Sequence, residues 1–521
     1  MSSAGRFHEH LPWSFITKFH EGVVVQKDGI LQRTFAYRAP DIDSSSPAEV
    51  NALSIRVNDF AKRLGQGWAF QMEAQRFQTR EYPKAFEYPA ASHSTLAPYL
   101  VDREREEAFR AAGRHFESSY YITFIYKPPS ESIKKLTRMF VQSGISGQGK
   151  SVRENVEYFV NETNVVAAVL SGDMLLQPLD NEQTIAYLHS SISMKRHHIH
   201  FPATQILLDR ILPDSELYTG YPIMKLGDYW IPIVGVNDFP EETYPAIFDD
   251  LNRMRLEYRW MTRYICAGKE EGKKEAQKKE KAHRGSRKTF FQTFLESTTG
   301  EDTGARNHGA GEKEMDAISA GVEIETDIGA LGYYTTCVMV WSKNIATAKK
   351  YADEVKAVIT SKSFTCKDET FNALEAFKSM MPGQIYANYR ALPVMTYTLS
   401  HIVPLSSVWA GARRNEHAGL VSGVDLPHLV CSTAEGTPFF LNLNPSDVGH
   451  AAIWGPTGAG KSTLLNLLEI QFFKYPGSQV IVFDKGRSCR QICLASGGLY
   501  YEPAAESPAA VSLQPSAPAR P

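Results

Sequence analysis

The residues best suited to chemistry lie between His450 and Phe483, where Gly455-Pro-Thr-Gly-Ala-Gly-Lys461-Ser462 fits the pattern Gly-x-x-x-x-Gly-Lys-Ser/Thr. This pattern is typical of a loop that binds nucleotide phosphates. Its glycines allow a backbone whose N–H groups point inward at a polyphosphate, and a helix beginning near Lys461 adds the positive end of its dipole. We therefore expect Lys461 to reach the β and γ phosphates of ATP and the Ser462 hydroxyl to bind Mg²⁺.

The predicted nucleotide-binding residues are consecutive, and Ser462 among them is the predicted metal ligand: Gly455, Pro456, Thr457, Gly458, Ala459, Gly460, Lys461, Ser462 and Thr463. Gly455, Gly458 and Gly460 are expected to shape the loop. No catalytic residue is predicted. Asp484 is the acidic residue that follows the motif's helix and second apolar run, and it suits either a contact with the site or a turn at the end of a strand.

The segments around the motif predict the order strand, loop, helix, strand. Ala451 to Trp454 is an apolar run, expected to be a strand that leads into the loop. A helix with a broad apolar face should follow the loop and stop at Tyr475-Pro476-Gly477. Gln479 to Phe483 is expected to be a second, buried strand. The residues of the apolar helix face are Leu464, Leu465, Leu467, Leu468, Ile470 and Phe472.

Upstream of the motif, strands and helices alternate with clear turn and capping signals. Asp28-Gly29 predicts a hairpin turn, because both positions tolerate positive φ. Ser46-Pro-Ala-Glu49 predicts a capped helix start, with Gly65 as the stop. Trp68, Phe70, Met72 and Ala74 alternate with polar residues, which indicates a strand with one buried face. Further predictions are a helix near 101–116, a strand near 120–126, a core-packing stripe at helical spacing over 251–265, a strand over 333–341, helices over 345–359 and 370–381, and a hairpin of 428–432 with 438–443.

Length and composition predict a cytoplasmic, globular protein of about three domains. The chain has 521 residues and is 43% hydrophobic. Lys and Arg total 56 against 58 Asp and Glu, so no global positive field would attract nucleic acid, and direct nucleic-acid binding is not evident. No run reaches the roughly 18 apolar residues of a membrane span, and the N-terminus lacks the build of a signal peptide.

The expected fold class is α/β and α+β multidomain, with N-terminal mixed α+β regions followed by a P-loop nucleotide-binding domain. Residues 1–175 are predicted to form the first α+β domain and 176–417 the central domain, which contains a charged helix and flexible loop near 269–315. Residues 418–502 would begin the nucleotide-binding domain. The tail, 503–521, is rich in proline and alanine and is expected to stay disordered.

Phrases along most of the chain, from about residue 10 to 500, resemble the CagE/TrbE/VirB family of type IV secretion ATPases, in particular the conjugal-transfer TrbE type. The resemblance implies a RecA-like ATPase fold and a bacterial motor on the cytoplasmic face of the inner membrane. Its implied role is to energise pilus and channel assembly, as a homo-oligomer with other conjugation subunits. The stretches that carry it are "VVVQKDGILQRTFAYRAPD", "RLGQGWAFQMEAQR", "SMMPGQIYANYR", "SHIVPLSSVWAG", "DVGHAAIWGPTGAGKSTLLN" and "FDKGRS".

The end of the chain departs from that family. The last 19 residues look like readthrough in a wrong frame, and we find no apolar strand after the loop that ends in the Mg²⁺-ordering Walker B acid. The expectation is a C-terminally truncated family member that binds ATP and Mg²⁺ but hydrolyses ATP negligibly. Two alternatives are a nonenzymatic assembly or scaffold subunit of the same apparatus and, less favoured, a DNA-pumping coupling ATPase.

Overall fold

The structure is a computed structural model that describes residues 2–501, apart from 4–6, 42, 80–81, 83–95, 130–148, 198, 202–205, 221, 241, 269–328, 388–391, 434 and 445–448. The chain forms two compact units. Unit 1 contains residues 1–77 and 118–408, and unit 2 contains residues 78–117 and 409–521. The charged segment and loop predicted near 269–315 and the tail 503–521 lie outside the described residues.

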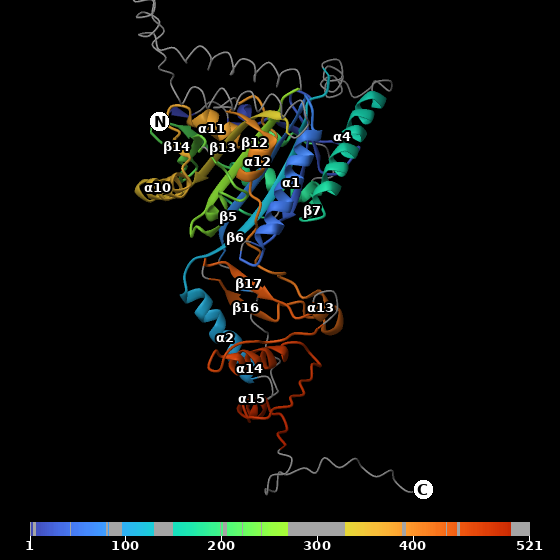
Figure 1. Cartoon of the computed structure of the whole chain (residues 1–521), viewed down its shortest axis with the longest axis vertical. Coiled ribbons are helices and arrows are strands. Elements are labelled where there is room, and N and C mark those ends of the chain that lie inside the picture. Colours follow the sequence, from blue (N-terminus) through green and yellow to red (C-terminus); the bar gives the residue numbers. More distant parts are fainter. Residues whose placement is uncertain are drawn as a thin grey trace, which may run out of the picture. The chain divides into compact units, whose positions relative to one another are not determined.

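Unit 1 is built on a mixed α/β plan around an 11-stranded sheet, in the order β14-β11-β13-β12-β5-β6-β4-β3-β2, with β15 on β13 and β7 on β4 (Figure 1). At its centre, β12 is antiparallel to both β5 and β13. The strands are β2 (Trp13–Ile16), β3 (Val23–Gln26), β4 (Leu31–Arg38), β5 (Trp68–Thr79), β6 (His115–Tyr126), β7 (Leu175–Pro178), β11 (Ile233–Asp238), β12 (Tyr258–Cys266), β13 (Leu331–Val340), β14 (Thr365–Asp368) and β15 (Leu392–Met395).

Helices cover both faces of this sheet. One core contains residues of α1 (Pro47–Arg63), α4 (Gly149–Leu170), α10 (Ile345–Ser361) and α12 (Thr396–Ile402). The other contains residues of α5 (Asn181–Ile192), α6 (Leu208–Ile211) and α11 (Ala373–Ser379). The remaining elements of unit 1 are the 3-10 helices η1 (Phe7–His10) and η3 (Asp249–Arg253), and a small sheet of β1 (Ser2–Ser3), β8 (Leu217–Thr219), β9 (Lys225–Leu226) and β10 (Tyr229–Trp230).

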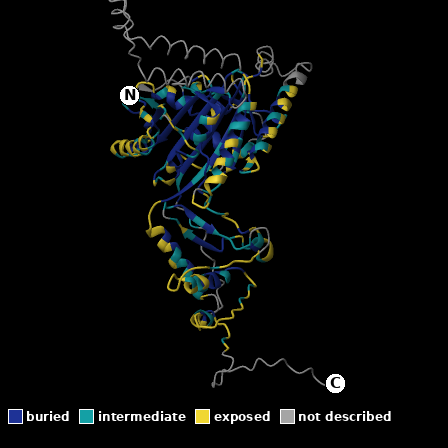
Figure 2. Ribbon diagram, viewed as in Figure 1, coloured by how far each residue is buried: buried dark blue, intermediate teal, exposed yellow. Residues whose placement is uncertain are grey.

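Because both faces are covered, the expectation that the Trp68 strand has one buried face is wrong. β5 is buried along almost its whole length, and in Figure 2 the central strands are dark blue between helices with exposed outer faces. Its polar side chains are therefore in the core. Glu73 is fully buried, and its carboxylate binds the Arg259 guanidinium of β12 at 2.5 Å and accepts a hydrogen bond from Tyr187 of α5. Paired burial of this kind avoids leaving an isolated charge in a medium of low polarity.

The local signals for turns and caps are confirmed. Helix α1 starts at Pro47 with a complete capping box, in which the Ser46 hydroxyl accepts from the Glu49 amide and the Glu49 carboxylate accepts from the Ser46 amide. β3 and β4 form the hairpin predicted at Asp28-Gly29. The strands near 120–126 and 333–341, the helices over 345–359 and 370–381, and the hairpin of 428–432 with 438–443 are also present. Their ends differ from the expected ones, most of all in β6, which begins at His115, and in α11, which spans only Ala373–Ser379.

The stripe over 251–265 is core, but most of it is not helical. Residues 249–253 form η3, and 258–266 form strand β12. Successive residues of β12 point into opposite cores: Trp260 belongs to one and Met261 to the other. A strand buried on both faces is apolar at nearly every position, so apolar residues can fall at helical spacing by coincidence.

Unit 2 draws on two distant parts of the sequence. Its elements are α2 (Leu96–Ala111), α13 (Glu416–Ser422), the hairpin of β16 (Leu429–Ser432) and β17 (Pro438–Leu441), α14 (Lys461–Phe472) and α15 (Arg490–Ala495). The predicted boundaries at 175/176 and 417/418 do not coincide with the two units, since strands on both sides of residue 175 share one sheet.

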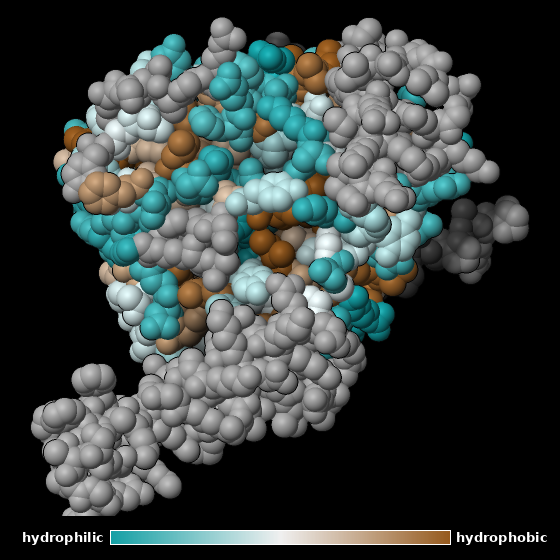
Figure 3. All heavy atoms as spheres, turned by 90° about the horizontal axis from the view of Figure 1, so that it is seen from above, coloured by the Kyte–Doolittle hydropathy of each residue, from teal (hydrophilic) through white to brown (hydrophobic). Residues whose placement is uncertain are grey.

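Within the residues described, no helix has the length and apolarity required to cross a bilayer. The view from above shows hydrophilic residues over much of the described surface, with smaller groups of hydrophobic residues between them (Figure 3).

Candidate functional site

The motif singled out in the sequence forms a loop followed by a helix. Helix α14 begins at Lys461, so Lys461 and Ser462 lie in its first turn, as expected. Gly460 caps the helix in the left-handed conformation with φ 85°, and Gly458 has φ 84°. These two positions need glycine, because an L side chain is strained at such angles. Left-handed glycines directly before a helix are compatible with a loop whose N–H groups face an anion.

The Lys461 side chain lies across its own loop. Its Nζ donates a hydrogen bond to the Pro456 carbonyl at 2.7 Å. Residues 455–460 are exposed, and the first-turn N–H groups of a helix have no acceptor within the helix. The loop thus offers one lysine ammonium, the amides of the first helical turn and a serine hydroxyl close together. That set of donors fits a polyphosphate with its bound divalent cation.

The two strands predicted beside the loop are not formed. Residues 451–454 and 479–483 have no strand pairing in the described part of the chain. Trp454 is 90% exposed and Phe483 is 98% exposed. A strand forms only when a neighbouring strand accepts and donates its backbone hydrogen bonds. Among the described residues of unit 2, β16 pairs with β17 and Gly411 forms an isolated bridge with Phe440, but neither contact involves 451–454 or 479–483. The expectation that 479–483 is a buried strand is therefore wrong for burial as well as for pairing, because the local sequence cannot supply the partner that would cover these side chains.

The C-terminal half of α14 is held firmly. The His428 ring binds the Leu468 carbonyl through Nε2 at 2.8 Å, and burial lowers the pKa of His428 to about 4, so the ring is neutral at physiological pH. Lys474 donates to the Pro427 carbonyl at 3.1 Å, and burial lowers the pKa of this lysine to about 8. The Tyr475 hydroxyl donates to the Leu426 carbonyl at 2.8 Å. Three hydrogen bonds therefore join residues 426–428 to this end of the helix.

Helix α2 completes the support of α14. It packs against α14, and its Phe109 joins a small core with Val430 of β16 and Phe440 of β17. Sequence reasoning did not identify this helix, His428, Lys474 or Tyr475 as supports of α14 and of the loop before it. No local signal marks them, because the contacts join segments that are far apart in the sequence.

Asp484 has a structural role in a turn. Its carboxylate accepts hydrogen bonds from the amides of Gly486 at 2.9 Å and Cys489 at 3.0 Å, and from the Ser488 hydroxyl at 3.1 Å. The two hydrogen bonds from backbone amides lower the pKa of Asp484 to about 2, because they favour the charged form of the carboxylate. Of the two roles that the sequence left open for Asp484, the geometry favours the turn.

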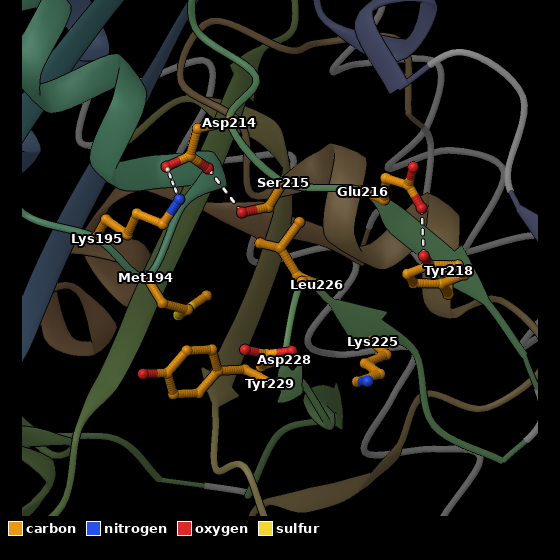
Figure 4. A pocket seen from close by; sticks show the side chains of 11 residues that line it. Met194, Lys195, Asp214, Ser215, Glu216, Tyr218, Lys225, Leu226, Asp228 and Tyr229 are labelled. Atoms are coloured by element: carbon orange, nitrogen blue, oxygen red, sulfur yellow. Dashed lines mark hydrogen bonds and ion pairs between the residues drawn. The ribbon is translucent and has the colours of Figure 1, made fainter.

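A separate cavity of about 510 Å³ lies in unit 1 and is lined by both polar and apolar side chains, among them Asp214, Met194 and Leu226 (Figure 4). Ser193 and Ser215 both donate their hydroxyls to Asp214, and Lys195 forms an ion pair with it. Burial opposes ionisation of Asp214, but these hydrogen bonds outweigh it and lower its pKa. His189 contacts the same carboxylate at 3.3 Å. Both serines donate to a carboxylate of lowered pKa, which is a weak base, and His189 contacts that carboxylate instead of a serine, so the cluster does not have the arrangement of an activated nucleophile.

Comparison with known proteins assigns the chain. Residues 22–134 match the family described as "Type IV secretion system ATPase VirB4/TrbE, N-terminal domain". The conjugal transfer protein TrbE of Rhizobium radiobacter is 30% identical over 497 residues, which cover 92% of this chain and 59% of that protein. The chain belongs to the VirB4/TrbE family of type IV secretion ATPases.

Other VirB4/TrbE relatives agree with this assignment. Sinorhizobium fredii has a probable conjugal transfer protein TrbE that is described as two separate parts. The second of them is 32% identical over 68% of this chain and 52% of that protein, and the first is 36% identical over 20% of this chain and 70% of that protein. The type IV secretion system protein virB4 of Bartonella quintana is 18% identical over 94% of this chain. The chain thus spans a little over half the length of the TrbE and VirB4 relatives that match most of it.

Proposed function

We propose that this VirB4/TrbE chain binds ATP and Mg²⁺ at Gly455–Thr463, as the start of a RecA-like, Walker A-containing ATPase domain. The observation that carries the proposal is the loop geometry, with left-handed Gly458 and Gly460 placed directly before a helix that begins at Lys461. Lys461 would leave the Pro456 carbonyl to neutralise phosphate charge, and Ser462 would hold Mg²⁺. When bound, Mg²⁺ supplies charge stabilisation at the phosphates.

The protein's proposed place is within a conjugal DNA-transfer apparatus of the type IV secretion class. There it would act on the cytoplasmic face of the inner membrane, with other subunits of the apparatus and with copies of itself, in energising pilus and channel assembly and substrate transfer. Membership of the family supports this role.

Nucleotide binding is tested by titrating Mg-ATP into the full chain and into Lys461→Ala. Loss of a charged hydrogen bond to phosphate should weaken binding by about 10- to 100-fold. Lys485→Ala is a matched control, because Lys485 is another exposed lysine of unit 2 outside the motif. Equal affinities for the wild type and Lys461→Ala would refute the assignment of the loop.

We expect the chain alone to hydrolyse ATP negligibly. Phosphoryl transfer requires a group that fixes Mg²⁺ and the attacking water, and the loop itself supplies only Lys461, Ser462 and backbone donors. Asp484 is engaged in its turn. Steady-state phosphate release above the Lys461→Ala background would contradict this expectation and would direct attention to Asp484 as an acid of the site.

The engagement of Asp484 also supports the second candidate function, a nonenzymatic assembly or scaffold subunit of the same apparatus. In that case unit 1, whose large sheet is covered by helices on both faces, would carry the function. Wild-type transfer by a Lys461→Ala strain in a conjugation assay would favour the scaffold, and loss of transfer would favour the ATP-dependent role.

A further inference from the structure

A second cavity of unit 1, of about 320 Å³, is lined by the sheet, by helix α5 and by the segment that follows α5. The sheet contributes Ala36 of β4 and Tyr121 of β6, which lie opposite each other on the two paired strands. Helix α5 contributes Ala186 and Tyr187. Because positions 36 and 186 both carry only a methyl group, neither the strand nor the helix fills the space with its own side chain.

The two tyrosines of this cavity are held in place by the core. Tyr187 is 3% exposed, and its ring centroid lies 4.2 Å from that of Tyr121. The Tyr187 hydroxyl donates to the Glu73 carboxylate at 2.7 Å, and that carboxylate is also bound by Arg259. Because the Tyr187 hydroxyl is engaged in the core, its ring carbons are what it can offer a ligand. Ring carbons suit a flat apolar group.

Three consecutive residues after α5 add nitrogen donors to the same cavity: Lys195, Arg196 and His197. The Arg196 guanidinium lies 3.9 Å from the centroid of the Phe77 ring and donates a hydrogen bond to Gln75 Oε1 at 3.0 Å. Both partners are neutral, so they fix the guanidinium without cancelling its charge. The described residues that line the cavity include no carboxylate.

The neighbouring carboxylates leave Arg196 as the main cation of the cavity. Lys195 is paired with Asp214 at 3.3 Å, on the side of the larger cavity (Figure 4). Glu257 and Glu73 act on Arg196 electrostatically but lie outside the lining, and Glu73 is already bound by Arg259. The cavity therefore combines an apolar, aromatic wall with a fixed guanidinium.

We propose that this cavity binds an aromatic carboxylate of about the size of one amino-acid residue. The carboxylate binds the Arg196 guanidinium, whose planar fork of donors matches two carboxylate oxygens, and the aromatic group lies against Tyr121 and Tyr187. The volume is at the lower end of the range of about 300 to 1,000 Å³ for ligand sites, which favours one residue over a nucleotide. The C-terminal residue of a partner polypeptide and a free aromatic acid both have this chemistry.

The probe is N-acetyl-phenylalanine, titrated into the full chain and followed by ligand-observed NMR. Its amide is the matched ligand without the charge. We expect the acid to bind with a Kd on the order of 1 mM, as suits so small a ligand. The amide should bind at least about tenfold more weakly, because it loses the charge-assisted hydrogen bonds to Arg196.

Variants of the chain test the same contacts. Arg196→Gln should weaken binding of the acid by about tenfold. Arg210→Gln is the matched control, because Arg210 is an exposed arginine of α6 outside the lining, and it should change the affinity by less than about twofold. Ala186→Leu puts a larger side chain into the cavity and should abolish binding.

A longer peptide that ends in phenylalanine with a free carboxylate separates the two sources of the ligand. Binding at least as tight as that of the single residue supports the site as a receptor for a chain end. Binding of the single residue alone supports a site for a free acid.

Three results would overturn the proposal. The first is equal affinity of the wild type for the acid and the amide, or no binding of either. The second is equal loss of affinity in Arg196→Gln and Arg210→Gln. The third is wild-type affinity in Ala186→Leu while the α5 amides keep their hydrogen-exchange protection. If Ala186→Leu disrupts α5, the comparison of acid and amide in the wild type still decides.

Discussion

Gly383→Ala should destabilise unit 1 strongly, because the Met381-Pro-Gly383 turn is fitted against the side chains of the sheet. Gly383 has φ +87°, and a Cβ there would lie 1.7 Å from Gln32 Oε1 and 2.3 Å from Gln26 Nε2. Both glutamines are buried, so neither can move into solvent. Their displacement would break the bonds that Gln26 Nε2 donates to Gln32 Oε1 and to the Gly383 carbonyl, each 2.8 Å long.

The expected cost follows from these contacts. Positive φ for alanine costs about 1 kcal/mol. The loss of two buried hydrogen bonds adds about 1 to 3 kcal/mol, and the cost is higher if a buried polar group stays unpaired. The total is about 2 to 4 kcal/mol. Gly67→Ala is the control, since Gly67 lies in unit 1 with φ +88° and its added Cβ would approach only the Lys127 carbonyl, at 3.2 Å. We expect it to cost about 1 to 2 kcal/mol, mostly from strain at positive φ.

The assay is hydrogen exchange of β4 and β5 amides, which reports the free energy of unfolding of unit 1 in a chain whose two units need not unfold together. A double-mutant cycle with Gln32→Ala isolates the clash, because removal of the glutamine makes room for the methyl group that Gly383→Ala adds. Gly383→Ala costing no more than Gly67→Ala, or strict additivity with Gln32→Ala, would refute this reasoning.

Three further predictions concern unit 1. Glu73→Ala leaves the Arg259 guanidinium buried without its counter-charge and should lower the free energy of unfolding by about 3 to 5 kcal/mol. Hydrogen exchange of the β12 amides measures this loss of stability. A smaller loss than the isosteric Glu73→Gln causes would contradict the prediction. Burial raises the pKa of Asp249 from 3.8 to about 7, so the contribution of this residue to stability falls as the pH rises from about 4 to 7. Asp249→Asn should remove this fall and give the variant an advantage on the order of 4 kcal/mol above pH 7. Stability curves against pH that run parallel for wild type and variant would disprove this prediction. Ser46→Ala removes the helix cap and should cost about 1 kcal/mol by thermal denaturation, whereas Ser44→Ala, just before the cap, should change little.

The sequence alone determined the features whose physics is local. The capping box of Ser46 and Glu49 and the Asp28-Gly29 hairpin each satisfy backbone groups within a few residues, so they could be predicted without the rest of the fold. The loop at Gly455 to Ser462 and the helix start at Lys461 belong to the same class. Glycines in the left-handed conformation and a helix N-terminus are set by the chain next to them.

Only the tertiary structure decided which segments meet. The apolar pattern over 251–265 did not distinguish a helix from β12, because a strand covered on both faces loses the alternation that identifies it. The Glu73–Arg259 pair joins residues 186 positions apart, and α2, which comprises residues 96–111, packs against the distant helix α14. The expected strands at 451–454 and 479–483 are absent for the same reason, since a strand depends on its neighbour and no local sequence can provide one.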